Sequence, residues 1–218
     1  MKRNHEICTM QILLLAATEE EIRPFTEANT GIDVLVSGVG LPSAMYHLQK
    51  RMQQLDYDLI IQAGIAGSFN REIEIGQTVW VRQDTFGDLG TEEKENFSSL
   101  FDSGLAGKNE FPFTDGWLVN NNELTKKINL NSVTAVTVNK VTDSELQEQQ
   151  IINCFDPDIE SMEGAALHYV CLQENIPFIQ VRSVSNFVRE RDKTKWKMKE
   201  AISNLNAELL KLINGLTN

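Results

Sequence analysis

Three carboxylates follow the first apolar run of the chain, in the segment "AATEEEI", which contains Glu19, Glu20 and Glu21. One of them could hold a water molecule at the end of a strand and activate it as a general base. The alternative is a solvated, acidic first turn of a helix, which the helix dipole favours. The sequence alone leaves both interpretations open.

A further carboxylate, Glu163, precedes a run of small and apolar residues in "SMEGAAL" (161–167). A buried carboxylate is costly unless other groups bind it. Glu163 could cap the helix that follows, because free N–H groups and the helix dipole hold a negative charge there. Alternatively, it could accept hydrogen bonds from two adjacent hydroxyls, as on a ribose.

Amide and glycine residues stand at other strand ends. "VRSVSNF" ends an apolar run with Ser185 and Asn186, so the amide is either a turn residue or a group that reads the edge of a base. "SGVGLPSA" and "AGIAGSF" place glycines where a backbone can approach a ligand closely, although a simple chain turn also uses glycine. Neither segment matches a dinucleotide-binding or phosphate-loop motif.

Short apolar runs predict the strands that position these residues. They are rich in Val and Ile and cover 11–18, 32–40, 58–69, 77–83, 133–138 and 177–186. Helices are expected at about 42–55, 163–174 and 194–213. The alternation predicts a single α/β domain over residues 10–218, with a mixed central β-sheet flanked by helices, preceded by a disordered extension at 1–9. Ligands of such sheets bind beyond the carboxyl ends of the strands.

Composition narrows the classes of partner. The 218 residues carry a formal net charge of -11, which argues against nucleic acid or an anionic membrane and favours a small-molecule ligand. The three cysteines and three histidines lack the spacing of a metal site, so structural thiols in a reducing cytoplasm are expected. The first apolar run, at 12–17, is too short for a signal peptide or a membrane span.

The motifs together resemble a known family. "AATEEEI", "SGVGLPSA", "AGIAGSF" and "SMEGAALHYVCLQENIPFIQVRSVSN", in this order and at these separations, resemble the nucleoside phosphorylase and nucleosidase superfamily over about residues 10–213. Within it the chain is similar to the methylthioadenosine/adenosylhomocysteine nucleosidases, and it looks most like the futalosine hydrolases of an alternative menaquinone pathway. This finer likeness is carried by "FGDLG" (86–90), "FPF" (111–113), "TVNKVT" (137–142) and "RERDKTKW" (189–196).

The resemblance implies a three-layer α/β sandwich, a homodimer, and cleavage of a purine N-glycosidic bond without a metal or organic cofactor. Glu21 would activate the attacking water, and Met162 and Glu163 would bind the ribose. Arg182 would help to orient these carboxylates, unless it only forms a buried ion pair within the sheet. Hydrolysis is favoured over phosphorolysis, because carboxylates would repel a phosphate at this position.

The resemblance also implies a pocket for the base. Ala66 and Gly67 would line it, Val141 and Ser185 would contact the substrate, and Asn186 would face the purine. The adenine-specific nucleosidases carry an aspartate at the position of Asn186. An amide can instead donate to a 6-oxo oxygen and accept from a protonated N7, which points to hypoxanthine or guanine as the leaving base.

Futalosine would then be cleaved to hypoxanthine and dehypoxanthine futalosine. Its 5′ carboxylate group could meet an apolar wall of Phe86 and Phe113 from the long polar segment 84–116, which is expected to be a packed functional loop. Arg189 or Arg191 could pair with that carboxylate, or could simply be solvated beside neighbouring acids. Two alternatives remain open, an adenine-releasing nucleosidase and a nucleoside-binding protein without catalysis.

Overall fold

The computed structural model describes residues 10–28, 31–190 and 192–217, so the expected extension at 1–9 lies outside the described residues. The strands are β1 (Ile12–Ala16), β2 (Asp33–Val36), β3 (Leu59–Ser68), β4 (Thr78–Phe86), β5 (Gly90–Glu93), β6 (Asn96–Ser99), β7 (Leu118–Val119), β8 (Ser132–Thr137), β9 (Ile159–Ser161) and β10 (Phe178–Phe187). The helices are α1 (Glu19–Glu27), α2 (Leu41–Met52), α3 (Glu145–Phe155), α4 (Gly164–Glu174) and α5 (Met198–Thr217), with 3₁₀ turns η1 (Glu123–Lys127) and η2 (Lys193–Lys195).

The central sheet is mixed, as the sequence predicts, and it closes on itself. Its eight strands follow the order β10-β4-β8-β9-β3-β1-β2, with β7 beside β4. β10 also pairs in parallel with β3, so the path from β10 through β4, β8 and β9 returns to β10. β1 and β2 extend the sheet beyond β3 in parallel, whereas β4 runs antiparallel to β10.

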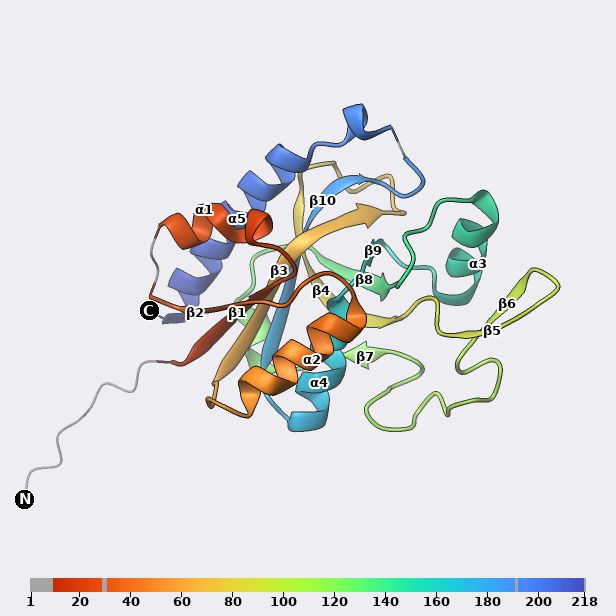
Figure 1. The fold of residues 1–218 in the computed structure, drawn as a ribbon, viewed down its shortest axis with the longest axis horizontal. Coiled ribbons are helices and arrows are strands. Elements are labelled where there is room, and N and C mark those ends of the chain that lie inside the picture. The colour runs from red at the N-terminus through yellow and green to blue at the C-terminus, as the bar shows by residue number, and fades with distance from the viewer. Residues whose placement is uncertain (1–9, 29–30, 191, 218) are drawn as a thin grey trace, which may run out of the picture.

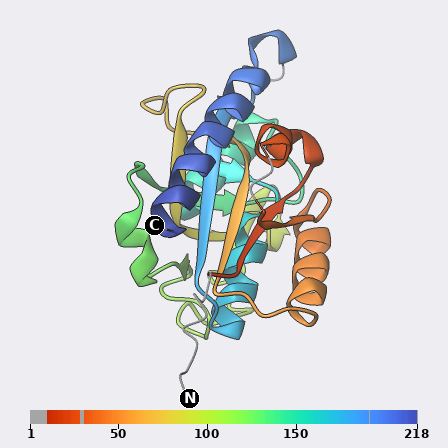
Figure 2. The ribbon, with the colours of Figure 1, turned by 90° about the vertical axis from the view of Figure 1, so that its left-hand side faces the viewer.

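Helices cover both faces of the sheet, which confirms the three-layer arrangement (Figure 1). Along β1, Ile12, Leu14 and Ala16 face the core cluster that contains residues of α1 and α5. Leu13 and Leu15 point to the opposite face, into the cluster that contains residues of α2 and α4. Side chains alternate along a strand, so a strand that is buried on both faces must be apolar throughout. Figure 2 shows α5 lying along the sheet beside α1.

The segment 84–116 is more regular than expected. Its first residues extend β4 to Phe86, and β5 and β6 then form an antiparallel hairpin. The rest folds back so that Phe113 packs against Phe86, Phe101 and Tyr169 of α4. The segment is therefore packed, as predicted, through an aromatic cluster. Within the described part of the chain, no helix is long and apolar enough to span a membrane.

Candidate active site

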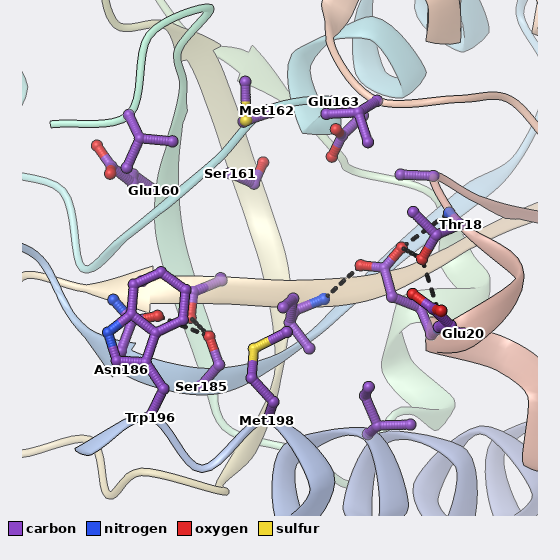
Figure 3. A pocket seen from close by; sticks show the side chains of 18 of the residues that line it. Thr18, Glu20, Glu160, Ser161, Met162, Glu163, Ser185, Asn186, Trp196 and Met198 are labelled. Carbon is purple, nitrogen blue, oxygen red and sulfur yellow. Dashed lines mark hydrogen bonds between the residues drawn. The ribbon is translucent and has the colours of Figure 1, made fainter. Parts of the chain in front are cut away.

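A cavity of about 320 Å³ opens at the carboxyl ends of β1, β3 and β10, the place that the strand pattern predicts. This volume is at the lower end of the range for pockets that bind small molecules. The expected site residues that line it are Glu21, Ala66, Gly67, Val141, Met162, Glu163, Ser185 and Asn186. In Figure 3, Glu163, Thr18 and Glu20 lie toward one end of the cavity, and Ser185, Asn186 and Trp196 lie toward the other.

Glu21 is the buried member of the acidic triplet. It is 8% exposed, whereas Glu19 and Glu20 are exposed, so the solvated-turn interpretation holds for those two residues alone. Glu21 Oε2 accepts hydrogen bonds from the N–H and the hydroxyl of Thr18 at 3.0 Å each, which completes a capping box at the start of α1. Its Oε1 accepts from Ile65 N at 3.0 Å. These bonds hold the carboxylate at the cavity wall.

Arg182 differs from the other expected site residues because it does not line the cavity. It lies behind the wall, 1% exposed, where it donates to Gln62 Oε1 at 2.9 Å and approaches Glu163 Oε2 at 3.7 Å. A Cβ atom on Gly64 would lie 2.3 Å from Arg182 Nη1 and 2.9 Å from Glu21 Oε1. Residue 64 must therefore be glycine, because both the guanidinium of Arg182 and the carboxylate of Glu21 approach its α-carbon closely. Arg182 thus forms a buried ion pair with Glu163, and the same contact orients the Glu163 carboxylate, so the two interpretations do not exclude each other.

Glu163 does not cap α4 with its side chain, so the capping interpretation is wrong. Ser161 Oγ accepts from Gly164 N at 3.2 Å, and Thr137 Oγ1 accepts from Ala165 N at 2.7 Å. The carboxylate of Glu163 points elsewhere, with Oε1 accepting from Gly40 N at 2.9 Å. Burial raises the pKa of Glu163 above its usual range, and the nearby Arg182 guanidinium partly offsets that rise.

Asp84 of β4 indirectly holds the first turn of α4 through Thr137. It is fully buried, and its Oδ1 accepts from the Thr137 hydroxyl at 3.0 Å. The same hydroxyl oxygen then accepts from Ala165 N, so Asp84 fixes the direction in which Thr137 caps the helix. Burial raises the pKa of Asp84 to about 6, and the bond from Thr137 limits the rise. The start of α4, and with it Glu163, is thus held by β4 and β8.

A β-bulge turns two neighbouring residues of β10 toward the cavity. Val184 pairs with Ala66 of β3 and Asn186 pairs with Gly67, which leaves Ser185 as the extra residue. Successive residues of a regular strand point to opposite faces, and a bulge relieves that constraint. The Ser185 hydroxyl donates to Asn186 Oδ1 at 2.7 Å, while Asn186 Nδ2 donates to Phe187 O at 2.8 Å. The amide oxygen keeps a second lone pair and the amide nitrogen a second proton.

Sequence reasoning missed several lining residues. Glu160 is one of them, although it stands two residues before Met162, a spacing that puts both side chains on one side of an extended segment. Trp196 is another, and it ends the segment "RERDKTKW", whose likeness to a family motif indicates no contact with a ligand. The other lining residues for which the sequence predicts no role include Thr18, Val39, Val138, Met198 and Ile202.

The residues expected around a 5′ substituent lie elsewhere. Phe86 and Phe113 belong to the aromatic cluster with Tyr169 and do not line this cavity, so the predicted apolar wall is wrong for a single chain. Arg189 forms an ion pair with Glu148 of α3, which is neither the predicted contact nor simple solvation. Arg191 lies outside the described residues.

Among the described residues, no group of three His, Cys, Asp or Glu side chains is placed to hold a metal ion. His168 is fully buried, and burial lowers its pKa to about 4, so the ring is neutral at pH 7. Its Nδ1 is 2.8 Å from Leu118 O, which fits a neutral ring that donates to a carbonyl. Cys154 and Cys171 are free thiols.

The chain belongs to the phosphorylase superfamily, whose family model matches residues 12–214. It is 28% identical to the futalosine hydrolase of Thermus thermophilus over 189 aligned residues. The alignment covers 84% of this chain and 82% of that protein. The futalosine hydrolase of Streptomyces coelicolor is 28% identical over 188 residues, covering 84% and 78%. The solved S-adenosylhomocysteine nucleosidase of Streptococcus pyogenes, in complex with 5-methylthiotubericidin, has a TM-score of 0.81 at 16% identity and covers 97% of this chain and 99% of that one. These matches confirm the recognised family, the fold class and the expected enzyme class, an N-glycosyl hydrolase.

Proposed function

We propose that this protein hydrolyses the N-glycosidic bond of futalosine and releases hypoxanthine and dehypoxanthine futalosine, as a step of menaquinone biosynthesis. One observation carries the proposal: two buried carboxylates, Glu21 and Glu163, line the same cavity as an amide, Asn186. The sequence relatives named futalosine hydrolase support the choice of substrate. The fold alone does not separate it from the adenosylhomocysteine nucleosidases, because the Streptococcus pyogenes enzyme shares the fold.

Cleavage of the C–N bond passes through an oxocarbenium-like state, as in glycoside hydrolysis. Glu163, beside Met162, accepts hydrogen bonds from the ribose hydroxyls and stabilises the developing positive charge. Arg182 keeps the Glu163 carboxylate in place by a contact of 3.7 Å. The sugar therefore occupies the end of the cavity where Glu163 lies.

Glu21 acts as the general base. Its carboxylate accepts hydrogen bonds from Thr18 and Ile65, which fix its orientation before a substrate binds. A water held by Glu21 then loses its proton as it attacks the sugar carbon. Phosphate would meet Glu20, Glu21 and Glu163 in the same cavity, so water is the favoured nucleophile. Purine release from futalosine in phosphate-free buffer, with dehypoxanthine futalosine rather than a sugar phosphate as the second product, tests this choice.

The purine lies at the opposite end, near Ala66, Gly67, Ser185 and Asn186. The second proton of Asn186 Nδ2 is donated to the 6-oxo oxygen, and Oδ1 accepts from N7 once N7 is protonated. The Ser185 hydroxyl, 2.7 Å from Asn186 Oδ1, holds the amide in the orientation that this contact needs. Val141 lines the same cavity. The homodimer and the cytoplasmic location implied by the resemblance remain predictions.

Replacement of Asn186 tests how the base is chosen. Asn186→Asp is expected to raise kcat/KM for adenine nucleosides relative to 6-oxopurine nucleosides, because a protonated aspartate donates to N7 and accepts from a 6-amino group. The measurement is purine release from matched pairs, inosine with adenosine and futalosine with its 6-amino analogue. If the ratio does not move toward adenine, Asn186 does not choose the base.

A further inference from the structure

Asn206 of α5 is a buried amide that the proposed mechanism does not use. It is 2% exposed and does not line the cavity. Its side chain reaches across to α1, where its Oδ1 accepts from Phe25 N at 3.0 Å and its Nδ2 donates to Glu21 O at 2.8 Å. α1 and α5 lie side by side on the same face of the sheet (Figure 2), so these bonds join two helices from opposite ends of the chain.

Asn206 binds two groups that belong to one step of the α1 helix. In a regular α-helix an N–H bonds to the carbonyl four residues before it, and Phe25 stands in this relation to Glu21. Pro24 lies inside the same helix, where a proline offers no N–H and presses its ring against the carbonyl four residues before it. α1 has only nine residues, too few for its own hydrogen bonds to make it stable. Asn206 therefore supports α1 at the step beside its proline.

The same amide links α1 to the part of α5 that lines the cavity. The second proton of Asn206 Nδ2 is donated to Ile202 O at 2.7 Å. Ile202 and Met198 of α5 line the cavity together with Glu21. The bonds from Nδ2 use both protons of the amide nitrogen, while its oxygen accepts from α1. Asn206 thus fixes the turn that carries Glu21 relative to the cavity wall that α5 provides.

Glu21 is consequently held at both ends. Thr18 and Ile65 bind its carboxylate and fix the direction in which it points, whereas Asn206 binds its main-chain carbonyl and fixes the place from which the side chain starts. We infer that Asn206 is a positioning residue for Glu21 and sets the distance between the general base and the attacking water. This inference rests on the proposed function and adds a residue that touches neither substrate nor water.

Asn206→Leu removes both hydrogen bonds to α1 and nearly preserves the shape of the side chain. We expect kcat to fall about 10- to 100-fold, because misplacement of a reacting group by about 1 Å has an effect of this size. The Kd of a bound nucleoside should stay close to that of the wild type, since Asn206 does not line the cavity. Asn204→Leu is the matched control. It removes a bond of 2.8 Å from an exposed position of α5 to Gly76 O, outside α1, and should leave kcat unchanged.

A comparison with Glu21→Gln separates positioning from a structural role. If Asn206 acts through Glu21, Asn206→Leu should lower the residual single-turnover rate of Glu21→Gln no more than about 2-fold, the scatter of independent changes. A residue that only stabilises the fold costs the same factor in both backgrounds. Equal factors would therefore overturn the inference, as would an unchanged kcat in Asn206→Leu. If Asn206→Leu shows no cooperative thermal unfolding, Asn206→Ser takes its place, because one short hydroxyl cannot bind both groups of α1.

The outcomes distinguish this inference from the proposed function. If the wild type cleaves futalosine and Asn206→Leu keeps its kcat, the proposed function stands and the role of Asn206 fails. If the wild type cleaves an adenine nucleoside and leaves futalosine intact, the proposed substrate is wrong, and the same comparison with that nucleoside still decides the role of Asn206. If the wild type cleaves no nucleoside, both the proposed function and the positioning role are overturned.

Discussion

Glu21→Gln is expected to lower the turnover of futalosine at least ~100-fold while nucleoside binding stays close to that of the wild type. The reason is that an amide cannot take a proton from the attacking water, and loss of a general base usually costs ~100-fold or more. Glutamine also satisfies the third helical position of a capping box, so the start of α1 should form. The measurement is single-turnover purine release, combined with the Kd of a bound nucleoside.

Glu19→Gln is the control for this change, because it alters an exposed carboxylate two residues away that does not line the cavity. It should leave turnover unchanged. Unchanged turnover in Glu21→Gln would move the general base to Glu19 or Glu20, or would remove it from the mechanism. The same experiment separates an enzyme from a nucleoside-binding protein, because binding alone needs no group that activates water.

Glu163→Gln should lower kcat/KM by about 100- to 1,000-fold, the scale for loss of one group that stabilises charge in the transition state. The amide oxygen can still accept from Gly40 N, but the negative charge beside the sugar is lost. Arg182, 3.7 Å from Glu163, also loses part of its compensation, so a lower melting temperature is expected as well. Steady-state kinetics and thermal unfolding measure the two effects.

A substrate analogue without the 2′-hydroxyl separates catalysis from stability in this variant. Removal of the hydroxyl should cost the wild type much more than it costs Glu163→Gln, because contacting groups are not additive. Glu174→Gln, at the exposed far end of the same helix, should behave like the wild type toward both substrates. Equal costs in the wild type and in Glu163→Gln would mean that Glu163 does not bind the ribose.

The fold was predictable where burial dictates the sequence. β1 and the first residues of β3 are buried on both faces, so they are apolar and stand out as continuous runs. β10 is buried as well, and its apolar residues alternate with polar ones such as Gln180 and Arg182. α3 was missed because Ile151 is its one buried residue, which leaves almost no helical periodicity. The β5–β6 hairpin was missed because Lys94 and Glu95 occupy its left-handed positions, where Gly or Asn would have given a signal.

The site was partly predictable, because residues after parallel strands meet at one edge of the sheet. This rule brings Glu21 and Asn186 to one cavity, because β1, β3 and β10 run in parallel. It does not account for Glu163, which reaches the same cavity after β9, a strand that runs antiparallel to β3. It gives no information on which carboxylate is buried or on what caps α4. Those answers depend on Thr137 and Arg182, which contact the site from β8 and β10 across long stretches of chain.

The central claim is tested most directly by incubating purified protein with futalosine, inosine, methylthioadenosine and adenosylhomocysteine in phosphate-free buffer and identifying the released base by chromatography. The account predicts hypoxanthine from futalosine, dehypoxanthine futalosine as the other product, and little or no adenine. Adenine release from methylthioadenosine or adenosylhomocysteine, with futalosine left intact, would contradict it and would identify an adenine-specific nucleosidase. Release of no base from any of the four would favour a nucleoside-binding protein.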